Sequence, residues 1–295
     1  MKLDIQQIRQ MITAQFANAD LSLAGIRAAM DATGAAAPMP AGVRVEATDV
    51  GVPGEWITPD EVDGARTLLY FHGGGYMAGS LLSSRNQAAR IAVASRAKVL
   101  SISYRLAPEN PFPAAIDDAL VAYRALREQG VAASDIGLVG GSAGGGLALA
   151  LALRVRDEEP ALGKPAAVAA FSAWMDLGCG WDSLQQAQDP LCQHGPVVMM
   201  AQAYLAGQSH EHPLASPLHA DLAGLPPLLI QVGGAEGLRD EGEAFAKKAR
   251  EAGVDVRFEE WPEMIHNWHV FAPMLDEATG ALDQIGGFLR ETVGR

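Results

Sequence analysis

A serine stands inside a run of glycines at the point where an apolar strand pattern gives way to a helix pattern. The run is Gly140-Gly141-Ser142-Ala143-Gly144-Gly145-Gly146, and it lies between an apolar stretch at residues 135–139 and a helix pattern at residues 147–155. A strand-to-helix turn this tight requires residues without bulk around the serine, and it lifts the hydroxyl clear of the sheet. The sequence therefore predicts an α/β protein in which Ser142 is a nucleophile beside the unpaired N–H groups of a helix N-terminus.

Two phosphate-binding motifs also use glycine-rich turns after a strand. A P-loop has Lys followed by Ser or Thr after its last glycine, whereas Leu147 follows Gly146 here. A dinucleotide-binding fingerprint needs an acidic residue at the end of the next strand, about 20 residues further on. The acidic run at residues 157–159 lies near that distance but ends a helix pattern. The nucleophile is therefore favoured over both phosphate-binding motifs.

A second glycine run follows another apolar strand pattern, at residues 67–71. Its sequence is His72-Gly73-Gly74-Gly75-Tyr76. Glycines directly after a strand allow backbone N–H groups to approach a ligand closely. An acyl-transfer enzyme needs such donors for the oxyanion of its tetrahedral intermediate, and each contributes roughly 3–4 kcal/mol. A plain glycine turn is the alternative. The expected donors are the N–H groups of Gly74, Gly75 and Ala143, with Gly73 as a weaker fourth.

Further motifs occur along the chain in the order of one known family. They are Tyr104-Arg105-Leu106-Ala107-Pro108-Glu109, Phe112-Pro113-Ala114-Ala115, Ser216-Pro217-Leu218, Leu225-Pro226-Pro227, Leu238-Arg239-Asp240-Glu241, and Trp261-Pro262 with His266. Over roughly residues 40 to 290 the chain resembles the hormone-sensitive-lipase-like branch of the α/β-hydrolases, which are bacterial carboxylesterases. The resemblance implies an α/β-hydrolase fold with a mainly parallel eight-stranded sheet, flanking helices and a helical cap. Gly141 departs from the family pattern, which usually has Asp or Thr there.

This fold places the acid and the base after the nucleophile, in the order serine, acid, histidine. His266 follows an alternating strand pattern at residues 254–261, and the family's ending agrees with that position. We expect His266 to act first as general base and then as general acid. The orienting acid is expected at Glu236, after the apolar stretch 228–232, where the family usually has Asp. Asp240 is the alternative, although it precedes a helix pattern and suits an N-cap.

Two amphipathic helix patterns precede the first strand pattern, one carrying Ile5, Ile8 and Ile12 and the next Leu23, Ile26 and Met30. The resemblance implies that about residues 1–40 join residues 178–212 to form the cap of a single domain, residues 1–295. For the apolar residues of these segments, ordinary helix core is the alternative to a role in binding. The residues expected to line the acyl and alcohol pockets are Tyr76, Met77, Trp174, Trp181 and Met199.

Charge and composition restrict the partners and the compartment. The net charge of −13 argues against nucleic acid and anionic membranes as partners. No apolar stretch without glycine or charged residues is long enough to span a membrane. Residues 1–31 lack the continuous apolar core of a signal peptide. The two cysteines, Cys179 and Cys192, imply no disulfide framework. We therefore expect a cytoplasmic protein, with the pairing of the two cysteines left open.

The expected function is that of a serine carboxylesterase acting on short- to medium-chain acyl esters through an acyl-enzyme, without cofactor or metal. The substrate is then a small-molecule ester or lactone. Lactone hydrolysis, amide hydrolysis and acyl transfer are alternatives on the same residues, and a non-catalytic small-molecule binding protein is a remote one. His210-Glu211-His212 could begin a metal site, but with no third ligand evident a solvated loop is favoured. The oligomeric state is left open between a monomer and a homodimer.

Overall fold

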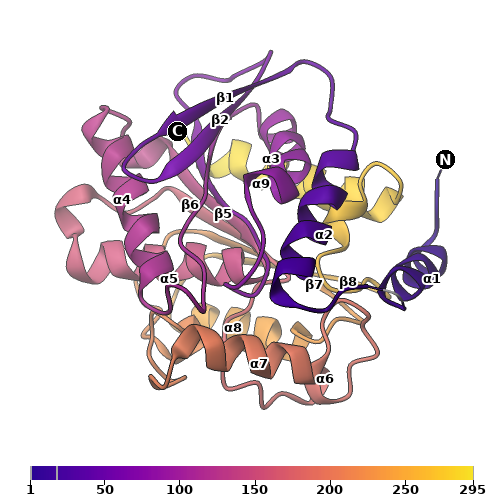
Figure 1. The fold of residues 1–295 in the computed structure, drawn as a ribbon. Coiled ribbons are helices and arrows are strands. Elements are labelled where there is room, and N and C mark those ends of the chain that lie inside the picture. The colour runs from indigo at the N-terminus through magenta and orange to yellow at the C-terminus, as the bar shows by residue number, and fades with distance from the viewer. Residues whose placement is uncertain (1, 18, 295) are drawn as a thin grey trace.

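Eight strands form one twisted sheet through the centre of the molecule (Figure 1). The computed structural model describes residues 2–17 and 19–294. The strands lie in the order β1-β2-β4-β3-β5-β6-β7-β8; β1, β2 and β4 pair in antiparallel fashion and all other neighbours are parallel. The strands are β1 (Val43–Asp49), β2 (Pro53–Pro59), β3 (Thr67–Phe71), β4 (Lys98–Ile102), β5 (Ile136–Gly141), β6 (Ala167–Phe171), β7 (Leu228–Gly233) and β8 (Val256–Trp261).

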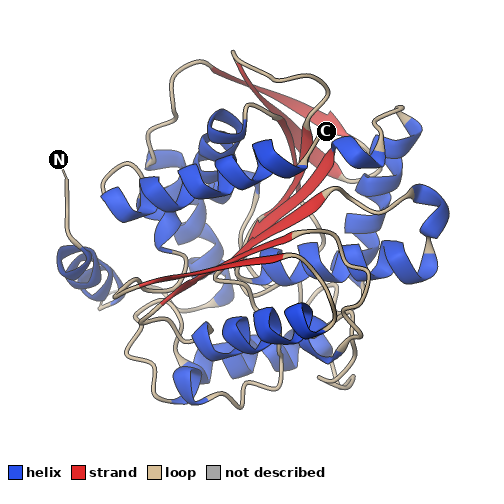
Figure 2. Cartoon of the chain, turned by 180° about the vertical axis from the view of Figure 1, so that it is seen from behind, coloured by secondary structure: helices blue, strands red, loops and turns tan. Residues whose placement is uncertain are grey.

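Helices cover both faces of the sheet (Figure 2). Helices α3 and α9 pack together in the apolar cluster on one face, while α4, α5 and α8 contribute to the cluster on the other. The helices are α1 (Ile5–Phe16), α2 (Leu23–Ala36), α3 (Leu81–Ser95), α4 (Ala114–Glu128), α5 (Ala143–Glu158), α6 (Asp182–Gln185), α7 (His194–Leu205), α8 (Arg239–Glu251) and α9 (Asp276–Thr292). The predicted mainly parallel, eight-stranded α/β sheet is confirmed.

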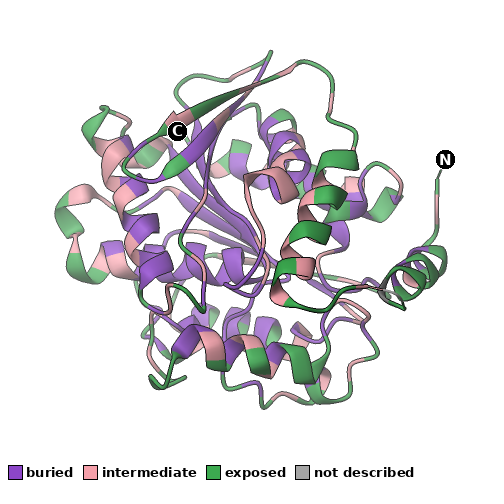
Figure 3. Ribbon diagram, viewed as in Figure 1, coloured by how far each residue is buried: buried purple, intermediate pink, exposed green. Residues whose placement is uncertain are grey.

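The central strands are apolar along their whole length because helices bury both of their faces. Every residue of β3, β5, β6 and β7 is buried, whereas β1, at the edge of the sheet, has no buried residue (Figure 3). Helix α5 is buried over most of its length, from Ala143 to Val155. The strand β5, the turn after it and helix α5 therefore form the most enclosed part of the fold.

The N-terminal helices contact the body of the protein in different ways. Helix α1 buries Ile5, Ile8 and Ile12 in the apolar cluster that contains α3 and α9. Helix α2 has no fully buried residue, so its predicted apolar face is only half covered. Arg27 on α2 is nevertheless anchored, since its guanidinium donates to the carbonyl of Met77 at 2.8 Å. No helix in the described part of the chain combines the length and apolarity needed to cross a bilayer.

Candidate active site

Ser142 occupies the turn between β5 and α5 in a strained backbone conformation, with φ 56° and ψ −127°. Close backbone packing explains why glycines surround it. A Cβ at Gly140 would lie 2.3 Å from the carbonyl oxygen of Gly144, and one at Gly144 would lie 2.1 Å from that of Phe71. Side chains at either position would push the turn away from the sheet. The glycines therefore hold Ser142 at the carboxyl edge of the parallel strands, where α/β sheets bind ligands.

Phe171 explains the unusual glycine at position 141. A Cβ at Gly141 would lie 2.2 Å from the Phe171 ring, which is completely buried at the end of β6. The aromatic ring thus fills the space into which a side chain at position 141 would project. In this chain a side chain at position 141 would clash with Phe171, so glycine is the residue that fits there.

His266 lies directly beside Ser142. Its Nε2 is 2.9 Å from Ser142 Oγ, a hydrogen-bonding distance. Both residues are largely enclosed, with 9% of Ser142 and 8% of His266 exposed. Burial lowers the pKa of His266 to about 4, because the imidazolium loses hydration there. The ring is therefore neutral at neutral pH and can accept the serine proton.

Glu236 is the carboxylate nearest the far side of the His266 ring. Glu236 Oε2 lies 3.8 Å from His266 Nδ1, longer than a hydrogen bond. Glu236 Oε1 and His266 Nδ1 are both buried without a hydrogen-bond partner among the described residues. Such contacts are often long in an unliganded enzyme and shorten when substrate binds. Burial raises the pKa of Glu236 well above its ordinary value, so its charge is favoured only with a cation beside it.

Asp240, the alternative acid, contacts Arg239 and Ser183 rather than His266. Its carboxylate accepts hydrogen bonds from Arg239 at 2.7 Å and from the backbone N–H of Ser183 at 2.9 Å. It occupies the first turn of α8, where a negative charge is favourable. Asp240 also lines a surface cleft of about 490 Å³ that does not include Ser142. The geometry favours Glu236.

Two polar residues that the sequence analysis did not identify hold the loop that carries His266. Asp189 is completely buried and accepts the backbone N–H of His266 at 2.5 Å. Ser172 donates to Glu236 at 2.5 Å and accepts the backbone N–H of Asn267 at 2.9 Å. Burial raises the pKa of Asp189, while the charge of Arg9 on α1 acts in the opposite direction. Asp-Pro at 189–190 is a common loop signal, so neither contact could be read from the sequence.

The glycine loop after β3 packs against the serine. A Cβ at Gly73 would lie 3.2 Å from Ser142 Cβ, and Gly74 and Gly75 both have positive φ, 119° and 61°. Within the described residues, the backbone N–H groups of Gly74, Gly75 and Ala143 donate to no protein acceptor. His72 anchors the start of this loop, because its ring stacks on the Tyr104 ring with centroids 4.2 Å apart. The loop that packs against the serine therefore carries unpaired backbone donors, and so does the residue after the serine.

Three of the five residues predicted to line the pocket are buried. Tyr76 and Trp174 are buried near the turn: Tyr76 stacks on Tyr204 with ring centroids 3.9 Å apart, and the backbone N–H of Trp174 donates to the Ser142 carbonyl at 3.0 Å. Met77 is buried beneath Arg27 of α2.

The other two residues predicted to line the pocket, Met199 and Trp181, have different surroundings. Met199 is 50% exposed, and it is the next residue, Met200, whose sulfur lies 2.2 Å from the point that a Cβ at Gly75 would occupy. Successive residues of a helix point about 100° apart, so Met199 and Met200 point in different directions. Trp181 donates to Asp176 at 2.9 Å and lines the same cleft as Asp240. Cys179 and Cys192 are free and buried.

Comparisons with known proteins agree with this geometry. A family model described as "alpha/beta hydrolase fold" matches residues 68–270. An acetyl-hydrolase of Streptomyces hygroscopicus is 48% identical over 242 residues, 81% of this chain and 80% of the relative. An esterase of Acinetobacter venetianus is 36% identical over 241 residues, 81% of this chain and 78% of the relative.

A solved structure extends the match to nearly the whole chain. The crystal structure of an esterase from the bacterial hormone-sensitive lipase family superposes with a TM-score of 0.93 at 39% identity, covering 98% of both chains. The fold, the sequence relatives and the arrangement around Ser142 all indicate hydrolysis of carboxylic esters. The chain belongs to the α/β-hydrolase family, in its hormone-sensitive-lipase-like branch of bacterial carboxylesterases.

Proposed function

We propose that this carboxylesterase works through an acyl-enzyme on Ser142. The observation that carries the proposal is the 2.9 Å contact between His266 Nε2 and Ser142 Oγ at the carboxyl edge of the sheet. Ser142 Oγ attacks the acyl carbon while His266 accepts its proton, and His266 then protonates the leaving alcohol. Water attacks the acyl-enzyme by the same route. Glu236 holds the imidazole in the required tautomer and stabilises the imidazolium that forms.

The oxyanion of each tetrahedral intermediate is proposed to bind the N–H groups around the serine. Gly74 and Gly75 supply donors from the loop after β3, with Gly73 as a weaker candidate. The Ala143 N–H adds a donor at the N-terminus of α5, where the helix dipole also favours negative charge. The support for this assignment is that the Gly74, Gly75 and Ala143 donors are unpaired among the described residues.

A cap over the site is proposed from residues 1–40 and 178–212. Met200 on α7 lies against Gly75, and Arg27 on α2 is bonded to the Met77 carbonyl and to Glu109. Arg9 on α1 donates to the Gln188 carbonyl at 3.3 Å, which connects the two parts of the cap. A cap held by these contacts encloses the nucleophile and favours acyl groups of short to medium length.

Hydrolysis of p-nitrophenyl esters from acetyl to dodecanoyl tests this function. We expect kcat/KM to be greatest for an acyl chain of short to medium length and to fall towards dodecanoyl, because Ser142 and His266 are so enclosed. Matched lactone, amide and alcohol-acceptor assays separate ester hydrolysis from the related reactions on the same residues. An optimum at dodecanoyl would contradict a closed cap, and binding without turnover would contradict the enzyme.

The pH dependence of kcat/KM should show an acid limb below the ordinary histidine pKa of about 6.5. A general base acts only when neutral, so activity is lost as the pH falls through the pKa of His266, which burial lowers to about 4. The measurement is kcat/KM from pH 4 to 9 on a neutral ester, with circular dichroism as the control for folding. An acid limb above pH 6.5 would mean that the negative charge of Glu236 raises the pKa of His266 by more than burial lowers it.

A cytoplasmic location is proposed from the sequence together with two thiols that are both free and buried. The oligomeric state is open between a monomer and a homodimer. The molar mass of the purified chain from sedimentation would distinguish the two.

A further inference from the structure

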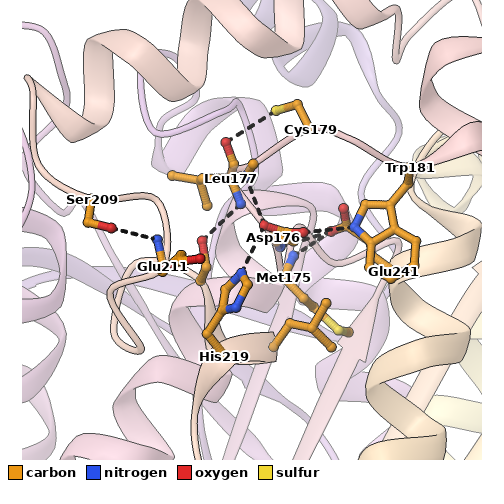
Figure 4. A network of polar contacts seen from close by, with 12 residues as sticks. Met175, Asp176, Leu177, Cys179, Trp181, Ser209, Glu211, His219 and Glu241 are labelled. Atoms are coloured by element: carbon orange, nitrogen blue, oxygen red, sulfur yellow. Dashed lines mark hydrogen bonds and ion pairs between the residues drawn. The ribbon is translucent and has the colours of Figure 1, made fainter.

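Three metal-ligating side chains converge outside the active site. Asp176 lies in the loop after β6, His210 follows α7, and His219 ends the short helix Pro217–His219 before β7. One ligand atom from each residue lies within 4.8 Å of the other two. Figure 4 shows the Asp176 side chain between His219 and Trp181, at the centre of a polar network.

The cluster contains only one of the two histidines of the His210-Glu211-His212 motif. The other histidine of the motif, His212, packs on Phe112 with ring centroids 4.8 Å apart. The partner of His210 is instead the distant pair formed by Asp176 and His219. Two of the three candidate ligands therefore come from outside the motif.

Asp176 is held in one orientation, as a carboxylate ligand needs to be. It is 8% exposed; its Oδ2 accepts the Trp181 indole N–H at 2.9 Å, and its Oδ1 accepts the Gly178 N–H at 2.8 Å. Contacts of this kind orient the ligands of metal sites. Oδ1 also faces His219 Nε2 at 3.3 Å.

Gly178 allows the third ligand to approach. A Cβ at this position would lie 2.9 Å from Asp176 Oδ1 and 3.0 Å from His210 Nδ1. Any larger residue would stand between the carboxylate and the His210 ring. Both histidines are exposed, so solvent can reach the point where the three groups meet.

We propose that Asp176, His210 and His219 form a binding site for a divalent transition metal, with zinc as the best fit. Two ligand atoms about 2.05 Å from a tetrahedral zinc ion lie about 3.3 Å apart, which matches the distance from His219 Nε2 to Asp176 Oδ1. Two imidazoles and one carboxylate suit zinc, and a fourth position stays open to water. An ordinary Asp176–His219 ion pair is the alternative.

The proposed metal joins the segments after β6 and α7 at a place connected to the nucleophile. The Trp174 indole N–H donates to the Asp176 carbonyl at 3.1 Å, and the Trp174 backbone N–H donates to the Ser142 carbonyl at 3.0 Å. Zinc would therefore stabilise the loop that borders the serine turn, while the ester chemistry itself takes place without it. The effect to measure is thermal stability, since a ligand that binds only the folded state raises Tm.

The test uses the untagged full chain after treatment with a chelator. We expect one Zn²⁺ to bind per chain by calorimetry, Co²⁺ to give the visible absorption of a tetrahedral site, and Zn²⁺ to raise Tm. His210→Asn should weaken zinc binding at least about tenfold and abolish the rise in Tm. It leaves the Asp176–His219 pair intact, so its metal-free Tm and esterase activity should match the wild type.

His212→Asn is the matched control, because this neighbouring histidine faces Phe112. It should keep the full zinc affinity. If His210→Asn fails to fold, His210→Gln answers the same question. Absence of zinc binding by the wild type, or equal binding by wild type and the His210 variant, would leave only the ion pair and overturn the proposal.

Discussion

Replacing Ser142 with alanine should lower kcat for ester hydrolysis by about a millionfold, judging by the loss of the nucleophile in another serine hydrolase. The reason is that Ser142 Oγ is the only protein atom on the proposed route that bonds to the acyl carbon. Alanine keeps the Cβ, so the strained backbone at φ 56° is as strained in the variant as in the wild type. Tm should therefore change little, and the loss can be assigned to chemistry. The measurement is single-turnover and steady-state hydrolysis of p-nitrophenyl butyrate.

A double variant makes this test sharper. His266→Ala should cost nearly as much as Ser142→Ala, and the two together should cost no more than either alone, because a base without its nucleophile has nothing to activate. Losses that multiply would show that the two residues act independently, despite the 2.9 Å between His266 Nε2 and Ser142 Oγ. Equal turnover by Ser142→Ala and wild type would exclude Ser142 as the nucleophile.

The parts of this protein that could be predicted from sequence are those set by local chemistry. Glycine packing around Ser142 and strand patterns before each loop are visible as residue types at fixed spacing, so the serine turn and the position of His266 could be found. The start of α5 could not be predicted. The sequence shows a helix pattern only from residue 147, whereas the helix begins at Ala143, because its first turn consists largely of glycines, which are poor helix formers.

What could not be predicted depends on segments that are distant in the chain. Asp189 reaches the His266 backbone only through the packing of the loop before α7, and nothing local distinguishes a buried loop aspartate from an exposed one. The choice between Met199 and Met200 depends on which face of α7 is buried. Val197, Ala201 and Tyr204 are buried, and that helical spacing places Met200, rather than Met199, beside the covered face. His219 meets Asp176, which lies in a different loop.

Replacing Glu236 with glutamine should lower kcat by about ten-thousandfold, the effect of the matching Asp-to-Asn change in a serine protease triad. Glutamine has nearly the same shape and can still hydrogen-bond with the Ser172 hydroxyl, which both donates and accepts, so the loop should stay folded. Its amide group, however, can donate to His266 Nδ1 and so place the ring proton on Nε2. That tautomer faces Ser142 with a hydrogen and cannot accept the serine proton.

Asp240→Asn is the control for that change, because it removes the same charge from the same segment of the chain. Asp240 bonds to Arg239 and to the Ser183 N–H at the protein surface, and a partly exposed ion pair of this kind contributes at most about 1 kcal/mol. Its variant should therefore keep kcat within about threefold of the wild type and show only a small fall in Tm. The reverse ranking would assign the orienting role to Asp240. Equal, small losses would mean that the 3.8 Å gap between Glu236 and His266 does not close during turnover, and that Asp189 holds the histidine loop without help from a second carboxylate.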